Sequence, residues 1–168
     1  MDTRKSIVVL FGILIIMTWV LAFANQAGAE TMNYKVYTWV SKGENVTIGD
    51  VEGHNIGVHV RGAFYAFENG EVATATVVGI FDFIKGKGPF VNYVTMNFAD
   101  GSIIMIKTAT AWTEAAQWTS EIIKGTGRFE GIKGKQFTSK FKMLAVEKGE
   151  PGSKGYGEGN LTFTLPSK

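Results

Sequence analysis

The histidines are the first side chains to consider for metal chemistry, because the chain contains only His54 and His59. They lie five residues apart, with Glu52 close in sequence. A protein zinc site uses three or four ligands in a defined geometry. His54 falls in a polar loop whereas His59 falls in a strand pattern, so the two need not converge. We predict no metal site and expect both histidines at the surface or the rim of the fold.

Asp82 is the first candidate for acid–base chemistry, since it interrupts an apolar strand pattern between two phenylalanines. Alternation places it on the opposite face from those rings. A carboxylate inside an apolar barrel would have a raised pKa and could act as a base. Pairing with Arg61 or Lys107 across the sheet, or simple solvation, are the structural alternatives. Asp82 and, second, Glu52 are therefore the catalytic candidates.

Four further side chains are candidates for ligand binding. Tyr65 and Tyr93 combine an apolar ring with a hydroxyl group, which suits the mouth of an apolar pocket. His59 and Arg61 share one face of the same strand pattern. Each of the four is also compatible with an ordinary structural role.

Other familiar chemistries lack their residues. The chain has no cysteine and no Gly-x-Ser-x-Gly motif, so the common covalent nucleophiles are missing. The glycine-rich stretch Gly125–Gly134 lacks the Gly-Lys-Ser/Thr ending of a phosphate loop. We predict no cofactor.

The first 29 residues resemble an export signal. Arg4 and Lys5 precede an apolar run from Ile7 to Ala24, and Ala27-Gly28-Ala29 offers small residues for cleavage. We predict a signal-peptide helix over 1–29, cut after Ala29, and a periplasmic or secreted domain over 30–168. An uncleaved membrane anchor is the alternative, and it would be the chain's only contact with a membrane.

The composition of the mature segment narrows its partners. Residues 30–168 contain 15 basic and 14 acidic residues, which leaves a net charge of +1. This is no electrostatic footprint for nucleic acid. Without cysteine, the domain must be stabilised by its hydrophobic core, which is feasible at this length.

The elements that must position these side chains are strands. Asn69-Gly70 and Asp100-Gly101 are preferred pairs for tight hairpin turns, and a glycine-rich connection spans 85–89. They join four expected strands into an antiparallel meander. The expected strands, in order, are Tyr34–Val40, a short Val46–Ile48 after a turn over 41–45, Ile56–Phe67, Val72–Ile84, Phe90–Phe98, Ile103–Trp112, Trp118–Phe129, Lys135–Glu147 and Tyr156–Leu165.

These eight or nine strands favour a closed barrel. Several are apolar on both faces, so one face would fill the interior and the other would need a cover. Phe129, between glycines, is expected to turn inward as a plug where the sheet bends. Apolar outer faces also suggest a homo-oligomer. A two-sheet sandwich is the alternative fold.

The run Gly125-Thr-Gly-Arg-Phe-Glu-Gly-Ile-Lys-Gly134 resembles the glycine–phenylalanine signature of the allene oxide cyclase and dirigent barrels. The terminal strand Leu161–Leu165 is similar to the way those chains end. The meander over 50–112 also resembles exported bacterial proteins of this type. The resemblance implies an eight-stranded, calycin-like antiparallel barrel with an apolar cavity, and a homo-oligomer that is often a dimer or trimer. The N-terminal strands do not align with those families, so their acidic catalytic residues are not assigned to positions in this sequence.

These observations lead to three hypotheses. The first is an exported barrel that binds a small apolar ligand, or serves as an oligomeric scaffold. The second, which rests on the resemblance, is a cofactor-free isomerase or cyclase using an acid inside the barrel. The third is a structural barrel filled by its own side chains.

Overall fold

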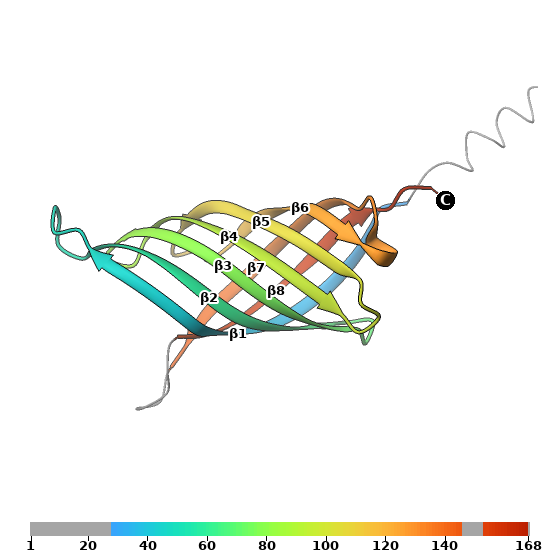
Figure 1. The fold of residues 1–168 in the computed structure, drawn as a ribbon, viewed down its shortest axis with the longest axis horizontal. Coiled ribbons are helices and arrows are strands. Elements are labelled where there is room, and N and C mark those ends of the chain that lie inside the picture. Colours follow the sequence, from blue (N-terminus) through green and yellow to red (C-terminus); the bar gives the residue numbers. More distant parts are fainter. Residues whose placement is uncertain (1–27, 146–152, 168) are drawn as a thin grey trace, which may run out of the picture. The chain divides into compact units, whose positions relative to one another are not determined.

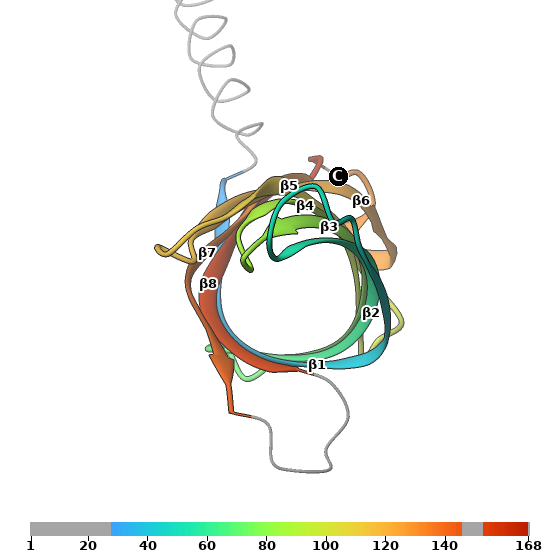
Figure 2. The ribbon, with the colours of Figure 1, turned by 90° about the vertical axis from the view of Figure 1, so that its left-hand side faces the viewer.

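A computed structural model describes residues 28–145 and 153–167. Eight antiparallel strands close into a barrel in chain order, β1 pairing with β8 (Figures 1 and 2). Residues Ala29–Leu165 form one compact unit. The strands are β1 (Glu30–Thr47), β2 (His54–Phe67), β3 (Val72–Ile84), β4 (Gly88–Phe98), β5 (Ile103–Trp112), β6 (Trp118–Thr126), β7 (Lys133–Leu144) and β8 (Lys154–Thr164), with a 3-10 turn, η1 (Gly127–Phe129), between β6 and β7.

The predicted closed barrel is confirmed, and the sandwich alternative is wrong. The tight turns lie where the sequence places them, since Gly70 and Gly101 have φ angles of 86° and 82°. Such angles favour glycine, which has no Cβ to clash with the backbone. Asn69 Oδ1 accepts a hydrogen bond from the Glu71 amide at 3.1 Å, and Asp100 Oδ1 accepts one from the Ser102 amide at 2.9 Å.

The expected turn over 41–45 is wrong, because β1 continues through it as one strand. The register opposite β2 shifts by one residue at Ser41, so that Val40 pairs with Arg61 and Lys42 with Val60. An extra residue of this kind bends a strand and exchanges its inner and outer faces. A second shift, at Ser139 in β7, has the same effect.

Aromatic rings fill one end of the barrel, which we call the closed end. It is bounded by the connections 68–71, 99–102 and 127–132. Phe129 turns inward from η1 with 3% of its surface exposed, which confirms its predicted role as a plug. Its ring centroid lies 4.9 Å from that of Phe98 and 6.0 Å from that of Phe163. The expected β6 strand therefore ends at Thr126, earlier than predicted.

The predicted signal peptide lies almost wholly outside the described residues, and it stays a prediction. Among the residues that the structure describes, none belongs to a helix long and apolar enough to cross a membrane.

Candidate functional site

The half of the barrel beyond this aromatic packing is hollow. We call this end, bounded by the connections 48–53, 85–87 and 113–117, the open end. The cavity measures about 540 Å³ and is bordered at the open end by Phe83, Gly86 and Ser153. Its deepest lining residues include Tyr34, Tyr65 and Val94, which also belong to the hydrophobic core. The interior is therefore divided into a packed half and a cavity.

Four aromatic rings from consecutive strands form one wall of the cavity. Phe90, Trp112, Trp118 and Phe141 come from β4, β5, β6 and β7 and all line it. The ring centroids of Trp112 and Trp118 lie 5.6 Å apart, and Phe141 lies 5.6 and 5.5 Å from them. We call these four residues the aromatic wall. It offers extended apolar surface with ring edges and faces, suited to contact with another ring.

A row of glycines in β8 makes room for this wall. Gly155 and Gly157 face the interior, and a Cβ built on either glycine would overlap the Phe141 ring. Gly159, one step further along the strand, leaves space for Tyr34 in the same way. The alternating glycines of Gly155-Tyr-Gly-Glu-Gly159 are the signal in the sequence that marks this inner face, and it is absent from the predictions above.

Arg61 is the cation of the cavity. Its Nε and Nη2 donate to Thr38 Oγ1 at 3.3 and 3.0 Å, and its Nη1 and Nη2 donate to the hydroxyl and carbonyl oxygens of Ser153, both at 3.2 Å. All of these acceptors are neutral. Within residues 28–145 and 153–167, Arg61 forms no ion pair with a carboxylate. Burial lowers its pKa, because desolvation disfavours the charged form.

His59 lies two residues from Arg61 on the same inner face. Its Nε2 and the Oδ1 of Asn92 are buried without a hydrogen-bond partner among the described residues. Both atoms crowd over Gly79, where a Cβ would overlap Asn92 Oδ1 and lie 2.7 Å from His59 Nε2. Desolvation, followed by the charge of Arg61, lowers the pKa of His59. His59 is therefore neutral near pH 7, and Arg61 supplies the positive charge here.

Hydroxyl groups line the deep part of the cavity. Tyr34 lies 3.0 Å from Thr138, oxygen to oxygen, and Thr108 lies 2.7 Å from Ser120. Burial raises the pKa of Tyr34 well above its usual value and that of Tyr65 to about 12. Both phenols are therefore neutral near pH 7 and can donate or accept hydrogen bonds.

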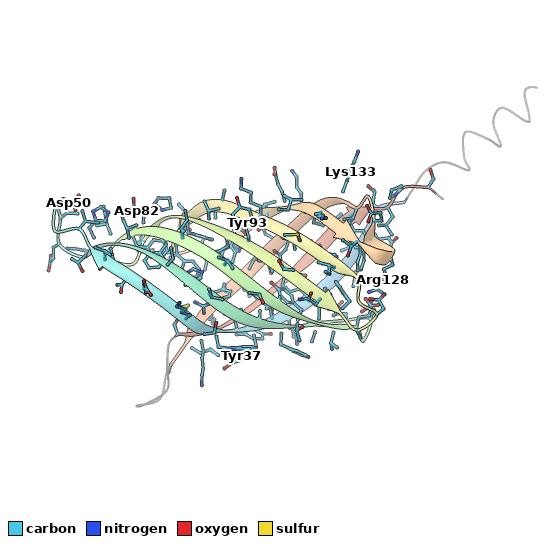
Figure 3. All side chains as sticks on the ribbon, viewed as in Figure 1. Tyr37, Asp50, Asp82, Tyr93, Arg128 and Lys133 are labelled. Carbon is cyan, nitrogen blue, oxygen red and sulfur yellow. The ribbon has the colours of Figure 1, made fainter. Side chains whose placement is uncertain are left out.

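Three of the four predicted ligand-binding residues do line the cavity, namely Tyr65, His59 and Arg61. Tyr93 does not, and its placement at the barrel mouth was wrong. Its side chain points outward from β4 (Figure 3), it is 44% exposed, and Lys107 Nζ lies 5.8 Å from its ring centroid. The alternation of β4 explains this, because Asn92 and Val94 on either side face inward.

Both catalytic candidates lie outside the cavity, which corrects the expectation of an interior acid. Asp82 lies on the outer face of β3 near the open end (Figure 3), and its side chain is 50% exposed. Its Oδ1 lies 2.7 Å from His54 Nε2, so its partner is neither Arg61 nor Lys107. Glu52 is 89% exposed in the β1–β2 loop and pairs with Lys85 at 3.1 Å. No buried residue in the described part of the chain is acidic.

His54 bridges two carboxylates at the open end. Its Nδ1 lies 2.5 Å from Asp50 Oδ1, while its Nε2 faces Asp82. The hydrogen bond with Asp50, and then the one with Asp82, raises the pKa of His54. Both nitrogens are thus occupied. In the part of the chain that the structure describes, no three His, Asp or Glu side chains are arranged to hold a metal ion.

Comparison with known proteins shows a likeness of fold to solved structures. No protein-family model and no curated protein matches the chain. Among solved structures it is similar to the pterocarpan synthase dirigent protein PsPTS1, with a TM-score of 0.53, 15% identity, and coverage of 86% of this chain and 99% of that one. It is also similar to a pyocyanin demethylase, with a TM-score of 0.51, 17% identity, and coverage of 80% and 100%. A second pterocarpan synthase dirigent protein, GePTS1, has a TM-score of 0.50 and 14% identity over 82% and 89%. The predicted resemblance to dirigent barrels is thus confirmed as a likeness of fold.

Proposed function

We propose that this protein binds a small, largely apolar molecule with a flat ring system inside the barrel. The observation that carries the proposal is the cavity of about 540 Å³ beside the aromatic wall. Small-molecule sites typically enclose about 300–1,000 Å³, with mainly apolar walls and a few fixed polar groups. Arg61, Tyr34 and Tyr65 are such groups here. The hollow half argues against a barrel filled entirely by its own side chains.

The similar solved structures support a role in small-molecule binding. Two are named for pterocarpan synthesis and one for pyocyanin demethylation, and each name refers to a small organic molecule. An isomerase or cyclase function has less support, because its candidate acids Asp82 and Glu52 lie outside the cavity. Binding of a small molecule is therefore the better supported function.

A fluorescence titration tests the proposal. Trp112 and Trp118 lie in the aromatic wall, whereas Trp39 lies on the outer face and Trp19 falls in the predicted leader. A Trp19→Phe/Trp39→Phe background therefore makes the emission report on the cavity. N-phenyl-1-naphthylamine serves as a neutral aromatic probe. We expect saturable quenching with one site per chain, and the proposal would be overturned if N-phenyl-1-naphthylamine, 1-naphthoate and 1-naphthamide all failed to bind saturably.

A pair of size-increasing variants locates the bound probe. Val94→Phe adds a ring to the cavity from β4, whereas Val91→Phe, on the same strand, adds one to the outer face. Overpacking costs about 1–3 kcal/mol of stability, so folding of both variants is checked by circular dichroism. We expect Val94→Phe to weaken probe binding at least tenfold and Val91→Phe to leave it unchanged. Equal affinities in both variants would place the probe outside the barrel.

A further inference from the structure

Arg61 indicates what charge a molecule bound in the cavity would carry. A guanidinium group has five N–H donors. Four hydrogen bonds to Thr38 and Ser153 hold the group in place, and Nη1 makes only one of them. The guanidinium is therefore positioned by neutral groups, and at least one N–H remains for a ligand.

The charge of this group is not balanced within the described residues. Glu44 is the one acidic residue among those that line the cavity there, and it is exposed and opposite Val58 at the rim, without an ion pair to Arg61. A cation withdrawn from water without a counter-ion is costly, and an anion brought beside it offsets that cost. His59, the nearest titratable neighbour on this face, adds no second charge because it is neutral near pH 7. A single negative charge would match the site.

We propose, on the basis of the proposed binding function, that the ligand is an aromatic monoanion whose acidic group contacts Arg61 while its rings lie along the aromatic wall. The cavity joins the two features, because Arg61 on β2 and Trp118 and Phe141 on β6 and β7 line one space. An aromatic carboxylate fits this pattern best, since guanidinium groups bind carboxylates through charge-assisted hydrogen bonds.

Two probes of nearly the same shape but different charge show how much the charge of the ligand contributes to affinity. 1-Naphthoate carries a carboxylate at pH 7.5, and 1-naphthamide replaces it with a neutral amide of nearly equal size. We expect the native protein to bind 1-naphthoate on the order of 10-fold or more tightly than 1-naphthamide, as hydrogen bonds to charged groups are the stronger kind. Equal affinity for both probes would overturn the inference and leave the proposed function intact. Saturable binding of neither probe nor N-phenyl-1-naphthylamine would overturn the proposed function itself.

Substitution of Arg61 tests whether its charge causes the preference for 1-naphthoate over 1-naphthamide. Arg61→Met removes the charge while keeping much of the apolar stem. We expect it to weaken 1-naphthoate binding by about 10–100-fold and to leave 1-naphthamide within about twofold. Arg61→Lys should restore part of the preference for the anion. Arg61→Gln serves in place of Arg61→Met if that variant does not fold. Arg128→Met is the matched control, because Arg128 pairs with Glu71 at the closed end and should leave both affinities unchanged.

A last variant tests for a counter-ion from the chain itself. Glu147 and Glu150 are the acidic residues nearest in sequence to Ser153 on its N-terminal side, and both lie outside the described residues. If Glu147→Gln/Glu150→Gln tightens 1-naphthoate binding tenfold or more, the chain already neutralises Arg61 and the inference is wrong. Unchanged affinity supports a ligand anion as the partner.

Discussion

Replacing Phe129 by alanine should remove a large part of the stability of the barrel. The side chain is 3% exposed, and its ring contacts those of Phe98 and Phe163. The guanidinium carbon of Arg128 lies 4.6 Å from the same ring centroid. Truncating a buried phenylalanine costs about 3–5 kcal/mol, from lost burial and from the cavity left behind. A typical domain has a total stability of only about 5–15 kcal/mol.

The measurement is urea unfolding followed by circular dichroism, with a thermal scan beside it. We expect Phe129→Ala to lower the free energy of unfolding by about 3–5 kcal/mol and the midpoint temperature by roughly 10–20 °C. Phe129→Leu, which leaves a smaller void, should cost about 1–2 kcal/mol.

Phe137 is the matched control, because it lies on the outer face of β7 and is 38% exposed. Its replacement by alanine should cost about 1–2 kcal/mol, in proportion to the smaller burial. Equal losses in Phe129→Ala and Phe137→Ala would refute the view that the closed end is the stabilising core. Where Phe129→Ala still folds, its affinity for 1-naphthamide should equal that of the native protein.

The remaining predictions concern the rim, the outer surface and the leader. Hydrogen bonds to Asp50 and Asp82 raise the pKa of His54 above its ordinary value of 6.5. The stability that these two hydrogen bonds contribute is therefore fully present below about pH 6.5, and it is lost as the pH rises through the pKa of His54 in the folded protein. An NMR titration of the His54 ring should give a midpoint above 6.5, and Asp82→Asn should lower it; a midpoint at or below that value contradicts the bridge. On the outer face, Ile80 is 55% exposed and pairs with Val58, itself 51% exposed, which predicts a homo-oligomer through this surface. Light scattering should give a smaller molar mass for the Ile80→Lys variant than for the native protein. A native protein that is already monomeric would contradict this prediction. Expression with the leader should yield an exported product beginning at Glu30, and an intact mass that retains residues 1–29 would favour the anchor instead.

The parts of the fold that were predictable are those set by local chemistry. Asn69-Gly70 and Asp100-Gly101 specify tight turns almost alone, and alternation within β2 correctly places His59 and Arg61 on one face. The inward turn of Phe129 follows from the glycines beside it. In each case the deciding interaction lies within a few residues of the feature.

The errors have a common physical cause, because they depend on register between strands. The shift at Ser139 leaves Phe137 on the outer face and Phe141 in the cavity, although plain alternation along β7 would put both on one face. The partner of Asp82 is His54, across a β2–β3 pairing that brings the start of one strand beside the end of the other. Alternation had kept Asp82 apart from the phenylalanines beside it, but it does not say which face turns inward.

The division of the barrel into two halves explains how one small domain can be both stable and hollow. An eight-stranded barrel is just wide enough to be filled by side chains, so a cavity forfeits packing that must be supplied elsewhere. Here the closed end supplies it with Phe67, Phe98, Phe129 and Phe163, all 6% exposed or less. At the other end, the glycines of β8 and Gly79 make space for Phe141, Tyr34 and Asn92, and Arg61 and the aromatic wall line one cavity. A Cβ at Gly155 or Gly157 would overlap Phe141, and one at Gly79 would overlap Asn92, so we interpret the missing Cβ atoms as what lets these lining side chains lie back against the barrel wall.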